Sequence, residues 1–408
     1  MPHSKRVIQV DDLAIARLHL LGSSQQDISA RLRIDKAEVS RSQKRTLGRY
    51  WKKSAPVEGP DWSLLSPAKA NQVDERINGK SHKPIKHAEL MKLAATQWPH
   101  LKSVTVIPAR LDQSAQIDAT HWSDWIAEYA RHAAAAVRPL MGRAMIWGVT
   151  WGSHVSALVD EMMRVSNGVR GGGAAIRVLP LCGNRCGERL TTETSSAIAE
   201  RLGMELAGQV TAPGALNMVP AFILGDLSDE QALTSWMEIS RSAGYCQIFG
   251  GEHIPESARP LALPVRPWVL ELDGVLTSVS RDGRPFGYGE TRMYENAGYD
   301  AAAIEGAYLG DIGGVGLVKP GQSPLPLVEK RWTGLRRSEL RACAARAAQA
   351  GSSAPGVVVL ASGPVRANSL LESVRQGYVS HAVIDESLNA ELAERLVLQA
   401  RPARGARS

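Results

Sequence analysis

Glycine ends several short apolar segments of this chain, at positions where a main chain could approach a bound small molecule. Glycine lets the backbone come close to a ligand, and a helix that begins just afterwards offers unpaired N–H groups to an anion. One such glycine is usually only a turn, but several at the strand ends of one sheet favour a ligand crevice. Five such places occur: Trp151-Gly152-Ser153-His154, Cys182-Gly183-Asn184, Gly250-Gly251, Gly310-Asp311 and Ser362-Gly363-Pro364-Val365-Arg366.

Cysteine and carboxylate pairs could support other chemistry. Cys182 and Cys186 have a spacing compatible with a metal or a redox pair, but a structural zinc site needs four ligands, and no second Cys/His pair is near them. Asp311 and Glu305 could be the paired carboxylates of an enzyme, and His154 and His253 could act as acid–base groups, although a loop histidine without function is the alternative for His253. We expect buried thiols, and we predict no metal, no cofactor and no catalytic residue.

A second set of residues could bind DNA. Residues 22–45, GSSQQDISARLRIDKAEVSRSQKR, have the spacing of a helix-turn-helix. A serine near the start can cap a first helix, on which Ile28 and Leu32 share one face. Residues 33–35 would then form the turn, with Ile34 buried between the two helices.

The second helix of this motif would be capped by Asp35 and would turn Val39 inward. In a helix-turn-helix, the second helix enters the major groove, and its early exposed residues reach base edges. We predict that the later basic residues bind phosphates. A helical hairpin with a solvated basic face is the alternative. The predicted DNA contacts are Gln25, Lys36, Ser40 and Arg41, with Lys44 and Arg45 on the phosphates.

Charge is concentrated in the same segment. Residues 1–53 contain twelve Lys and Arg against five Asp and Glu, a difference of +7, and the formal net charge of all 408 residues is also +7. The rest of the chain is therefore neutral in sum. This distribution favours a polyanionic partner for the N-terminal segment.

Composition sets the class of protein. A hydrophobic content of 44% is enough for a sizeable core, and four cysteines in 408 residues do not make a disulfide framework. We find neither a signal peptide nor an apolar run of the roughly 18 residues that span a bilayer. We expect a cytoplasmic protein without membrane contact.

From about residue 87 the sequence alternates helices with short apolar strands, which predicts a parallel sheet covered on both faces. The interval 252–307 breaks this rhythm, and Arg281-Asp282-Gly283-Arg284 there has the pattern of a hairpin turn. We interpret the interval as an inserted antiparallel subdomain. The predicted strands are residues 103–108, 144–152, 176–183, 245–251, 356–363 and 381–385.

The chain is thus expected to have four parts. Residues 1–53 form an all-α DNA-binding domain, and residues 54–86 a linker that could also serve oligomerisation. Residues 87–400 form an α/β effector domain, followed by a flexible tail at 401–408.

The ordered set of these segments resembles the SorC family of bacterial transcriptional regulators, also called sugar-binding DeoR-like regulators. These proteins join an N-terminal helix-turn-helix to an α/β effector domain related to ribose-5-phosphate isomerases and the CoA-transferase-like fold. The matching stretches occur in the family's order and span most of the chain: SSQQDISARLRIDKAEVSR, GVTWGSHVSAL, VLPLCG, FGG, YLGDIGG and VVLASGPVRANSLLESVRQGYVSHAVIDESLNAELAERL.

The resemblance implies a regulator whose affinity for operator DNA changes when a sugar, usually phosphorylated, enters the crevice. The loop at Gly152 would lie at the phosphate end, Asp311 would accept hydrogen bonds from sugar hydroxyls, and Arg366 would face the phosphate. Trp151 could stack on a sugar ring. The predicted effector contacts are Trp151, Gly152, Ser153, His154, Gly183, Gly250, Asp311 and Arg366.

The chain departs from the family pattern in two places that matter for the ligand. His154 stands where the family commonly has threonine, and Arg366 where it has lysine. A neutral histidine is bulkier than threonine and offers one donor, whereas arginine can pair with a carboxylate in bidentate fashion. The effector could thus be a sugar acid or a larger conjugate.

The sequence supports three functions to different degrees. The first is an operator-binding regulator controlled by a sugar-type effector, acting as a homodimer or homotetramer. The second is a sugar-phosphate isomerase-type enzyme, with the N-terminal segment used for assembly. The third is a DNA-binding regulator with a degenerate pocket, controlled by a partner protein.

Overall fold

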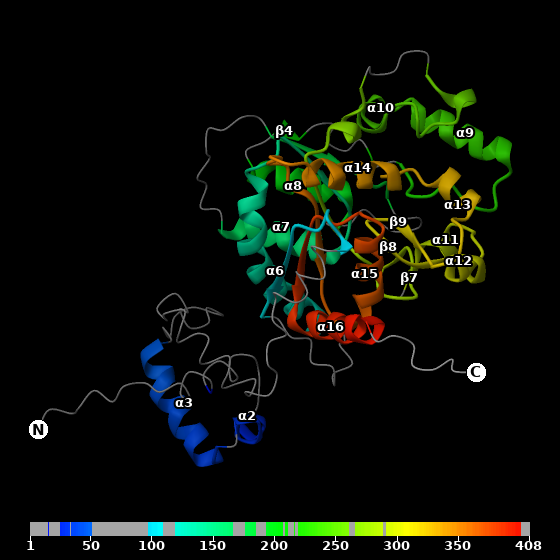
Figure 1. Ribbon diagram of the computed structural model, residues 1–408. Helices are drawn as coiled ribbons and strands as arrows, with labels where there is room; N and C mark the ends of the chain where they lie inside the picture. Colours follow the sequence, from blue (N-terminus) through cyan, green and yellow to red (C-terminus); the bar gives the residue numbers. More distant parts are fainter. Residues whose placement is uncertain are drawn as a thin grey trace, which may run out of the picture. The chain divides into compact units, whose positions relative to one another are not determined.

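The chain divides into two compact units, residues 1–86 and 87–408, which are described separately (Figure 1). The structure is a computed structural model. It describes residues 15, 25–32, 34–50, 97–108, 119–165, 176–184, 193–206, 209–210, 216, 219–260, 266–288 and 291–400.

In the described part of the smaller unit, a short turn joins two helices, α2 (Gln25–Leu32) and α3 (Lys36–Tyr50). The predicted inward residues Ile28, Leu32 and Val39 are fully buried. The structure therefore has helices at the two positions that the motif requires. The expected capping serine lies outside the described residues.

The turn between these helices is held by side chains on both sides. The carboxylate of Asp35 accepts the N–H of Ala37 at 3.1 Å, which confirms the predicted cap of α3. The hydroxyl of Ser29 donates to the carbonyl of Ile34 at 2.7 Å. Ile34 itself is half-buried rather than buried.

The larger unit is built on a seven-stranded sheet in the order β1-β11-β10-β5-β2-β3-β4. Every neighbouring pair in it is parallel, which confirms the predicted α/β class. The strands are β1 (Ser103–Ile107), β2 (Ile146–Val149), β3 (Arg177–Pro180), β4 (Gln209–Val210), β5 (Gly274–Ser278), β10 (Gly356–Ala361) and β11 (His381–Asp385).

Helices cover both faces of this sheet, and each face has its own apolar core (Figure 1). Consecutive strand residues point to opposite faces, so Val275 and Val357 join one core and Leu276 and Val358 the other. One face packs on α6 (Ala119–Met141), α7 (Ser153–Val165) and α8 (Ser195–Glu205). The other packs on α9 (Asp229–Ser240), α10 (Ala243–Phe249), α14 (Arg337–Ala348), α15 (Ala367–Arg375) and α16 (Glu386–Ala400).

The prediction of a strand at residues 245–251 is wrong, because this segment is helix α10. The hydroxyl of Ser242 accepts the N–H of Tyr245 at 3.3 Å and caps the helix. A short apolar run of this kind fits a buried helix as well as a buried strand, and the cap decides between them.

The prediction of an insertion at residues 252–307 is also wrong. Strand β5 lies inside that interval and pairs with β10 on one side and β2 on the other, in the middle of the sheet. The predicted turn does form, since the N–H of Arg284 reaches the carbonyl of Arg281 at 3.1 Å, but it joins no pair of hydrogen-bonded strands.

Among the described residues, antiparallel pairing occurs in two small hairpins and in isolated bridges between Phe222 and Trp332 and between Val279 and Ile312. Strands β6 (Gly287–Tyr288) and β7 (Thr291–Arg292) form one, and β8 (Tyr308–Ile312) and β9 (Val315–Val318) form the other. The remaining short elements are η2 (Glu256–Ala258), η3 (Trp268–Glu271), α11 (Met293–Asn296), α12 (Ala301–Ala307), α13 (Pro326–Arg331) and η4 (Pro364–Arg366).

Among the described residues, no helix has the length and apolar character that a bilayer crossing requires. No group of three or more His, Cys, Asp and Glu in the described ranges is placed to hold a metal ion. The described cysteines Cys182, Cys246 and Cys343 are buried thiols, and Cys186 lies outside the described residues.

Candidate functional site

The order of the strands creates a switch point between β2 and β5. From β2 the chain continues to β3 on one side, whereas from β5 it continues to β10 on the other. In open parallel sheets, ligands bind outside the carboxyl ends of the strands at such a point. The candidate site is therefore built from the segments that leave β2, β5, β10 and β11.

Gly152 connects the end of β2 to α7 and requires the absence of a side chain. Its φ is +129°, and a Cβ there would lie 2.8 Å from the hydroxyl of Ser278 at the end of β5. The carbonyl of Gly152 accepts the N–H of Ser156 at 2.9 Å, so α7 begins at once. The predicted glycine loop is thus a close contact between two strand ends.

His154 lies in the first turn of α7 and reaches across to β10. Its Nε2 is 2.5 Å from the hydroxyl of Ser362. The rings of Trp125 and Tyr129 form T-shaped contacts with the imidazole, with ring centroids 5.9 Å and 5.1 Å away. Burial, followed by the charge of Arg366, lowers the pKa of His154 well below 6.5. The imidazole is therefore neutral at physiological pH.

Arg366 is buried and ties two strand ends together. Its Nε donates to the carbonyl of Val279 at 3.3 Å and its Nη1 to that of Ser362 at 2.7 Å. Burial, with the nearby charge of Arg281, lowers its pKa to about 10, while Asp385 acts in the opposite direction. The guanidinium remains protonated at neutral pH, with main-chain carbonyls as partners.

Asp385 ends β11 and is fully buried. Its Oδ1 accepts the N–H groups of Gly363 at 3.0 Å and Leu388 at 2.9 Å, and its Oδ2 accepts the hydroxyl of Ser387 at 2.8 Å. Burial raises the pKa of this carboxyl, and the hydrogen bonds act against that rise. All these partners donate, as they would to an ionised carboxylate.

Asp282 occupies the start of α15. Its Oδ2 accepts the N–H of Asn368 at 3.0 Å, and its Oδ1 accepts the N–H and the hydroxyl of Ser369 at 2.8 Å and 2.9 Å. Its sequence context, Arg281-Asp282-Gly283-Arg284, indicates only a turn. Its partners are more than 80 positions away in the chain, so local pattern contains no signal for this contact.

Asp311 lies inside the β8–β9 hairpin and not before a helix, as its glycine motif had suggested. Its Oδ1 accepts the N–H of Gly314 at 2.9 Å, and its Oδ2 accepts that of Phe286 at 2.7 Å. Both oxygens therefore hold the main chain around the hairpin turn.

That turn lies directly on the switch point. The N–H of Gly313 donates to the carbonyl of Ser278 at 3.0 Å, and the thiol of Cys182 is 3.1 Å from the carbonyl of Gly313. Gly313 has a φ of +58°, and a Cβ there would lie 2.4 Å from Oγ1 of Thr277. The hairpin tip thus covers the carboxyl ends of β5 and β3.

Two of the predicted effector contacts, Gly183 and Gly250, do not lie in the open at the strand ends. A Cβ on Gly183 would lie 2.6 Å from the carbonyl oxygen of Val219, so main chain covers this glycine. Gly250 follows helix α10 rather than a strand, and it packs on Pro267, which leads into the amino end of β5. The structure therefore groups Gly152 with the residues at the ends of β10 and β11, and it leaves Gly250 apart from them.

An adjoining hollow was not anticipated from the sequence. Its lining includes Phe222, Phe286, Trp332, Glu329 and Arg337. Arg337 donates from Nη2 to Glu329 at 2.8 Å.

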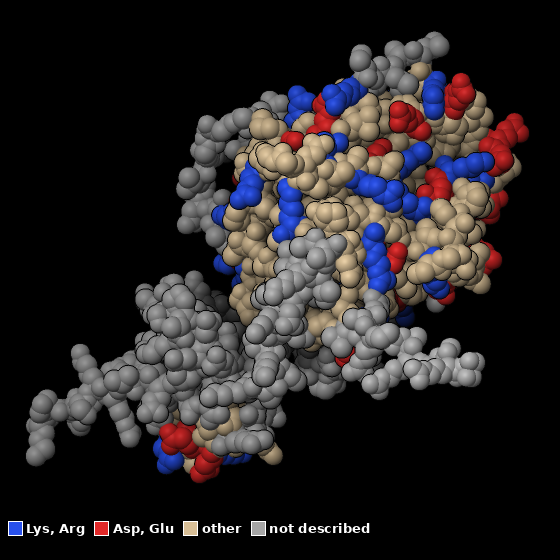
Figure 2. All heavy atoms as spheres, viewed as in Figure 1, with Lys and Arg blue, Asp and Glu red and all other residues tan. Residues whose placement is uncertain are grey.

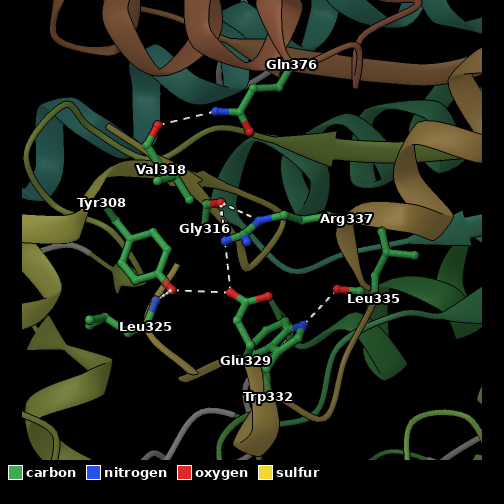
Figure 3. Close-up of polar contacts among 9 residues, drawn as sticks. All are labelled: Tyr308, Gly316, Val318, Leu325, Glu329, Trp332, Leu335, Arg337 and Gln376. Atoms are coloured by element: carbon green, nitrogen blue, oxygen red, sulfur yellow. Dashed lines mark hydrogen bonds and ion pairs between the residues drawn. The ribbon is translucent and has the colours of Figure 1, made fainter. Parts of the chain in front are cut away.

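The hollow is connected to the glycine loop by two indoles. The rings of Trp332 and Trp151 meet edge to face with centroids 5.6 Å apart. The indole N–H of Trp332 donates to the carbonyl of Leu335 at 2.7 Å (Figure 3), which fixes its orientation. Trp151 is thus part of an aromatic wall, a role that its own position in the sequence did not indicate.

The predicted DNA contacts on the smaller unit differ in exposure. Lys36 and Arg41 are exposed, and Arg41 forms an ion pair with Glu38 at 2.9 Å. Ser40 is half-buried, and Gln25 donates to Gln43 of α3 at 2.7 Å. The side chains of Lys44 and Arg45 lie outside the described residues.

On the larger unit, Lys and Arg are interspersed with Asp and Glu over the viewed face (Figure 2). This mixture agrees with the near-neutral sum of charge beyond residue 53. The excess of positive charge is therefore a property of the N-terminal segment.

No protein-family model matches the chain, and no curated protein matches it. Solved structures do. The full-length sorbitol operon regulator SorC from Klebsiella pneumoniae matches with a TM-score of 0.50 and 16% identity over 93% of this chain and 98% of its own.

Two further solved structures are similar over the larger part of the chain. A DeoR family transcriptional regulator from Listeria monocytogenes matches with a TM-score of 0.48 and 17% identity, over 75% of this chain and 99% of its own. A domain of a possible sugar-binding transcriptional regulator from Arthrobacter aurescens matches with a TM-score of 0.48 and 20% identity, over 78% of this chain and 100% of its own.

At this identity the match to the Klebsiella regulator establishes a shared fold. It covers nearly the whole of both chains, so it extends beyond the α/β unit. The chain therefore resembles, in its fold, the SorC-type transcriptional regulators to which its sequence motifs pointed.

Proposed function

We propose that this chain is a transcriptional regulator, not an enzyme, whose affinity for operator DNA is controlled by a sugar-type effector. The observation that carries the proposal is a buried polar cluster at the strand ends, in a fold shared with a full-length operon regulator. The partners are then operator DNA and one small molecule.

The assignment of an effector site rests on the free-energy cost of burying the polar cluster at the strand ends. Burying a charged group is expensive unless hydrogen bonds and opposite charges compensate, so a core seldom retains such groups without a functional reason. His154, Arg366 and Asp385 are all buried around the ends of strands at which α/β sheets bind ligands. We assign the effector to this edge, with Gly152 and Ser153 as main-chain contacts.

The DNA half rests on helix α3 and on the charge of its unit. Lys36 and Arg41 lie in its first two turns and are exposed, while Val39 between them is buried. This is the pattern of a recognition helix, whose early exposed residues meet base edges. Arg41 is our first candidate for a base contact.

The enzyme alternative finds less support. His154 and Ser362 are close enough to act as base and nucleophile, but Ser362 is fully buried, so no substrate meets its hydroxyl in this structure. The carboxylates once considered as a pair have separate tasks, because Asp311 holds main-chain N–H groups and Glu305 accepts the Tyr294 hydroxyl at 2.7 Å.

A homodimer or homotetramer completes the proposal. A dimer would present two copies of α3 to a pseudo-palindromic operator. Sedimentation of the full-length protein with and without DNA measures this state. A monomer under both conditions would contradict it.

The first experiment is binding of the full-length protein to the DNA upstream of its own gene. Replacing Arg41 by alanine should weaken specific binding by about 1–3 kcal/mol, roughly a 5- to 150-fold loss, because a base contact disappears. The folding of the larger unit should be unchanged. Fluorescence anisotropy with labelled DNA gives the dissociation constants.

Glu38→Gln is the matched control, since it removes the ion-pair partner and leaves the guanidinium in place. An exposed pair of this kind contributes only about 0.3–0.5 kcal/mol, so DNA affinity should hold or rise. Unchanged affinity in R41A would contradict our placement of the recognition helix.

A further inference from the structure

The outer face of helix α3 carries side chains whose chemistry selects particular bases. Resting on the proposed function, we propose that each operator half-site presents a guanine to Arg41 and, about two base pairs away, the methyl group of a thymine to Ala37. Ala37 then determines specificity together with Arg41.

The buried side of α3 fixes which residues face outward. Val39, Ser42 and Gln43 are buried and lie on one side of the helix. At about 100° per residue, Ala37 and Arg41 each lie about 160–200° around the helix from Val39, so both face away from the buried side. Both residues are exposed, in agreement with this geometry. A recognition helix presents such a line of residues to the base edges of the major groove.

One edge of the Arg41 guanidinium is already engaged. Its Nε donates to Oε2 of Glu38 at 2.9 Å, and its two Nη groups form no hydrogen bond with any described residue. The Nη groups are a pair of donors in a rigid fork. In the major groove guanine presents two acceptors, O6 and N7, whereas adenine presents one acceptor beside a donor. The donors that remain on Arg41 therefore match guanine better than adenine.

The same ion pair weakens the attraction of Arg41 for a phosphate. The Glu38 side chain is 40% exposed, and its carboxylate balances the charge of the guanidinium beside it. A phosphate that approached Arg41 would also meet this carboxylate, so attraction and repulsion would largely cancel. A base edge has no net charge, and its hydrogen bonds with the Nη groups are not opposed in this way. Arg41 therefore gains more from a base than from the DNA backbone.

Ala37 offers only its methyl group to the DNA. Its main-chain N–H donates to Oδ1 of Asp35 at 3.1 Å in the cap of α3, so this donor is engaged. Thymine alone among the four bases presents a methyl group in the major groove, and alanine packs against that group by apolar contact. A short side chain in the first turn also lets the start of α3 approach the bases closely, whereas the longer Arg41 spans a larger gap one turn later.

The spacing of the two residues sets the spacing of the two bases. Ala37 and Arg41 are four positions apart, which is about 6 Å along the axis of the helix. Base pairs follow one another about every 3.4 Å along DNA. The thymine and the guanine are therefore about two base pairs apart.

The test uses base analogues in the DNA segment that the full-length protein binds. Uracil in place of each thymine in turn removes the methyl group, and 7-deazaguanine in place of each guanine removes N7. Fluorescence anisotropy gives the dissociation constants. We expect one 7-deazaguanine per half-site to weaken binding at least about fivefold, and one uracil about two base pairs away to weaken it about two- to fivefold.

Two variants assign these effects to the two residues. In Arg41→Ala the effect of 7-deazaguanine should disappear and the effect of uracil should remain. In Ala37→Gly the effect of uracil should disappear and the effect of 7-deazaguanine should remain. Each variant is thus the matched control for the other. Both DNAs of a pair are measured on the same variant, so any partial loss of folded helix cancels in their ratio.

The outcomes separate this proposal from the proposed function. Sequence-specific binding in which no uracil effect depends on Ala37, or no 7-deazaguanine effect depends on Arg41, would overturn the inference and keep the regulator. A thymine and a guanine more than about three base pairs apart would overturn it as well. Absence of sequence-specific binding by the unchanged protein would reject the regulator and the inference together.

Discussion

At the scale of single residues, the edge of the sheet depends on contacts between positions far apart in the chain. His154 meets Ser362 across 208 positions, and Asp282 meets Asn368 across 86. Local glycine motifs and a family resemblance pointed to His154 and Arg366. Their partners were not predictable, because nothing in a local pattern records which distant strand end will lie beside another.

Stability at low pH should report the neutral His154. A histidine in the unfolded chain has a pKa near 6.5, whereas the pKa of His154 in the native state is lower. Below pH 6.5 the unfolded chain therefore binds a proton at this position that the native state does not bind. The contribution of His154 to the free energy of unfolding is thus constant above pH 6.5. Below pH 6.5 the free energy of unfolding falls by up to about 1.4 kcal/mol per pH unit. His253, and His381 with a pKa lowered to about 4, act in the same direction.

Urea unfolding between pH 8 and 5 measures this loss. His154→Gln keeps a hydrogen-bonding group near Ser362 but cannot gain the proton, so the variant should lose less stability over the same interval. A loss equal to that of the unchanged protein would contradict a buried, neutral imidazole at this position.

At the scale of elements, the alternation of apolar strands and helices predicted the parallel sheet, but it did not predict every member. Strand β5 lies in the segment that was predicted to be an insertion, and helix α10 lies in a segment that was predicted to be a strand. Both errors have one cause. A short apolar segment acquires its conformation from its neighbours in the fold, and its own periodicity is too short to decide.

The tip of the β8–β9 hairpin should tolerate no added methyl group. In Gly313→Ala the new Cβ would meet Oγ1 of Thr277 at 2.4 Å in a left-handed conformation. We expect a loss of about 2–4 kcal/mol of unfolding free energy, from strain and overpacking together.

Gly283→Ala is the matched control for the hairpin tip. Gly283 also has a positive φ, of +72°, but nothing lies within 4 Å of its Cβ position. The loss of unfolding free energy in this variant should be limited to the cost of placing alanine in a left-handed conformation, about 1–2 kcal/mol. Urea unfolding compares the two, and equal losses would show that the tip does not press on the strand ends.

At the scale of the whole molecule, two units must communicate if the chain is an effector-controlled regulator. Effector and DNA would then be coupled through one equilibrium between states, and the coupling must be reciprocal. The sequence predicted an all-α domain at residues 1–53, a linker at 54–86 and an α/β domain at 87–400. What it could not predict is which conformation each partner favours, because that depends on differential contacts in two states.

Reciprocity provides a quantitative prediction. If an effector changes the dissociation constant for operator DNA by a given factor, typically about 5- to 150-fold, operator DNA must change the dissociation constant for the effector by the same factor. Anisotropy gives the first number and calorimetry with and without DNA gives the second. Factors that differ beyond their errors would show that the two ligands do not act on a single equilibrium.

The position of β1 at one edge of the sheet has a consequence for biosynthesis. Its partner strand β11 follows 278 positions later, as the contact between Ser103 and His381 shows. At about 5–20 residues per second, the ribosome needs roughly 15–60 s to deliver that partner. Throughout this time the nascent chain would carry a complete N-terminal segment and an unfinished sheet. Under the proposed function, a truncated translation product would therefore retain α2 and α3 and lack the unit through which the effector acts.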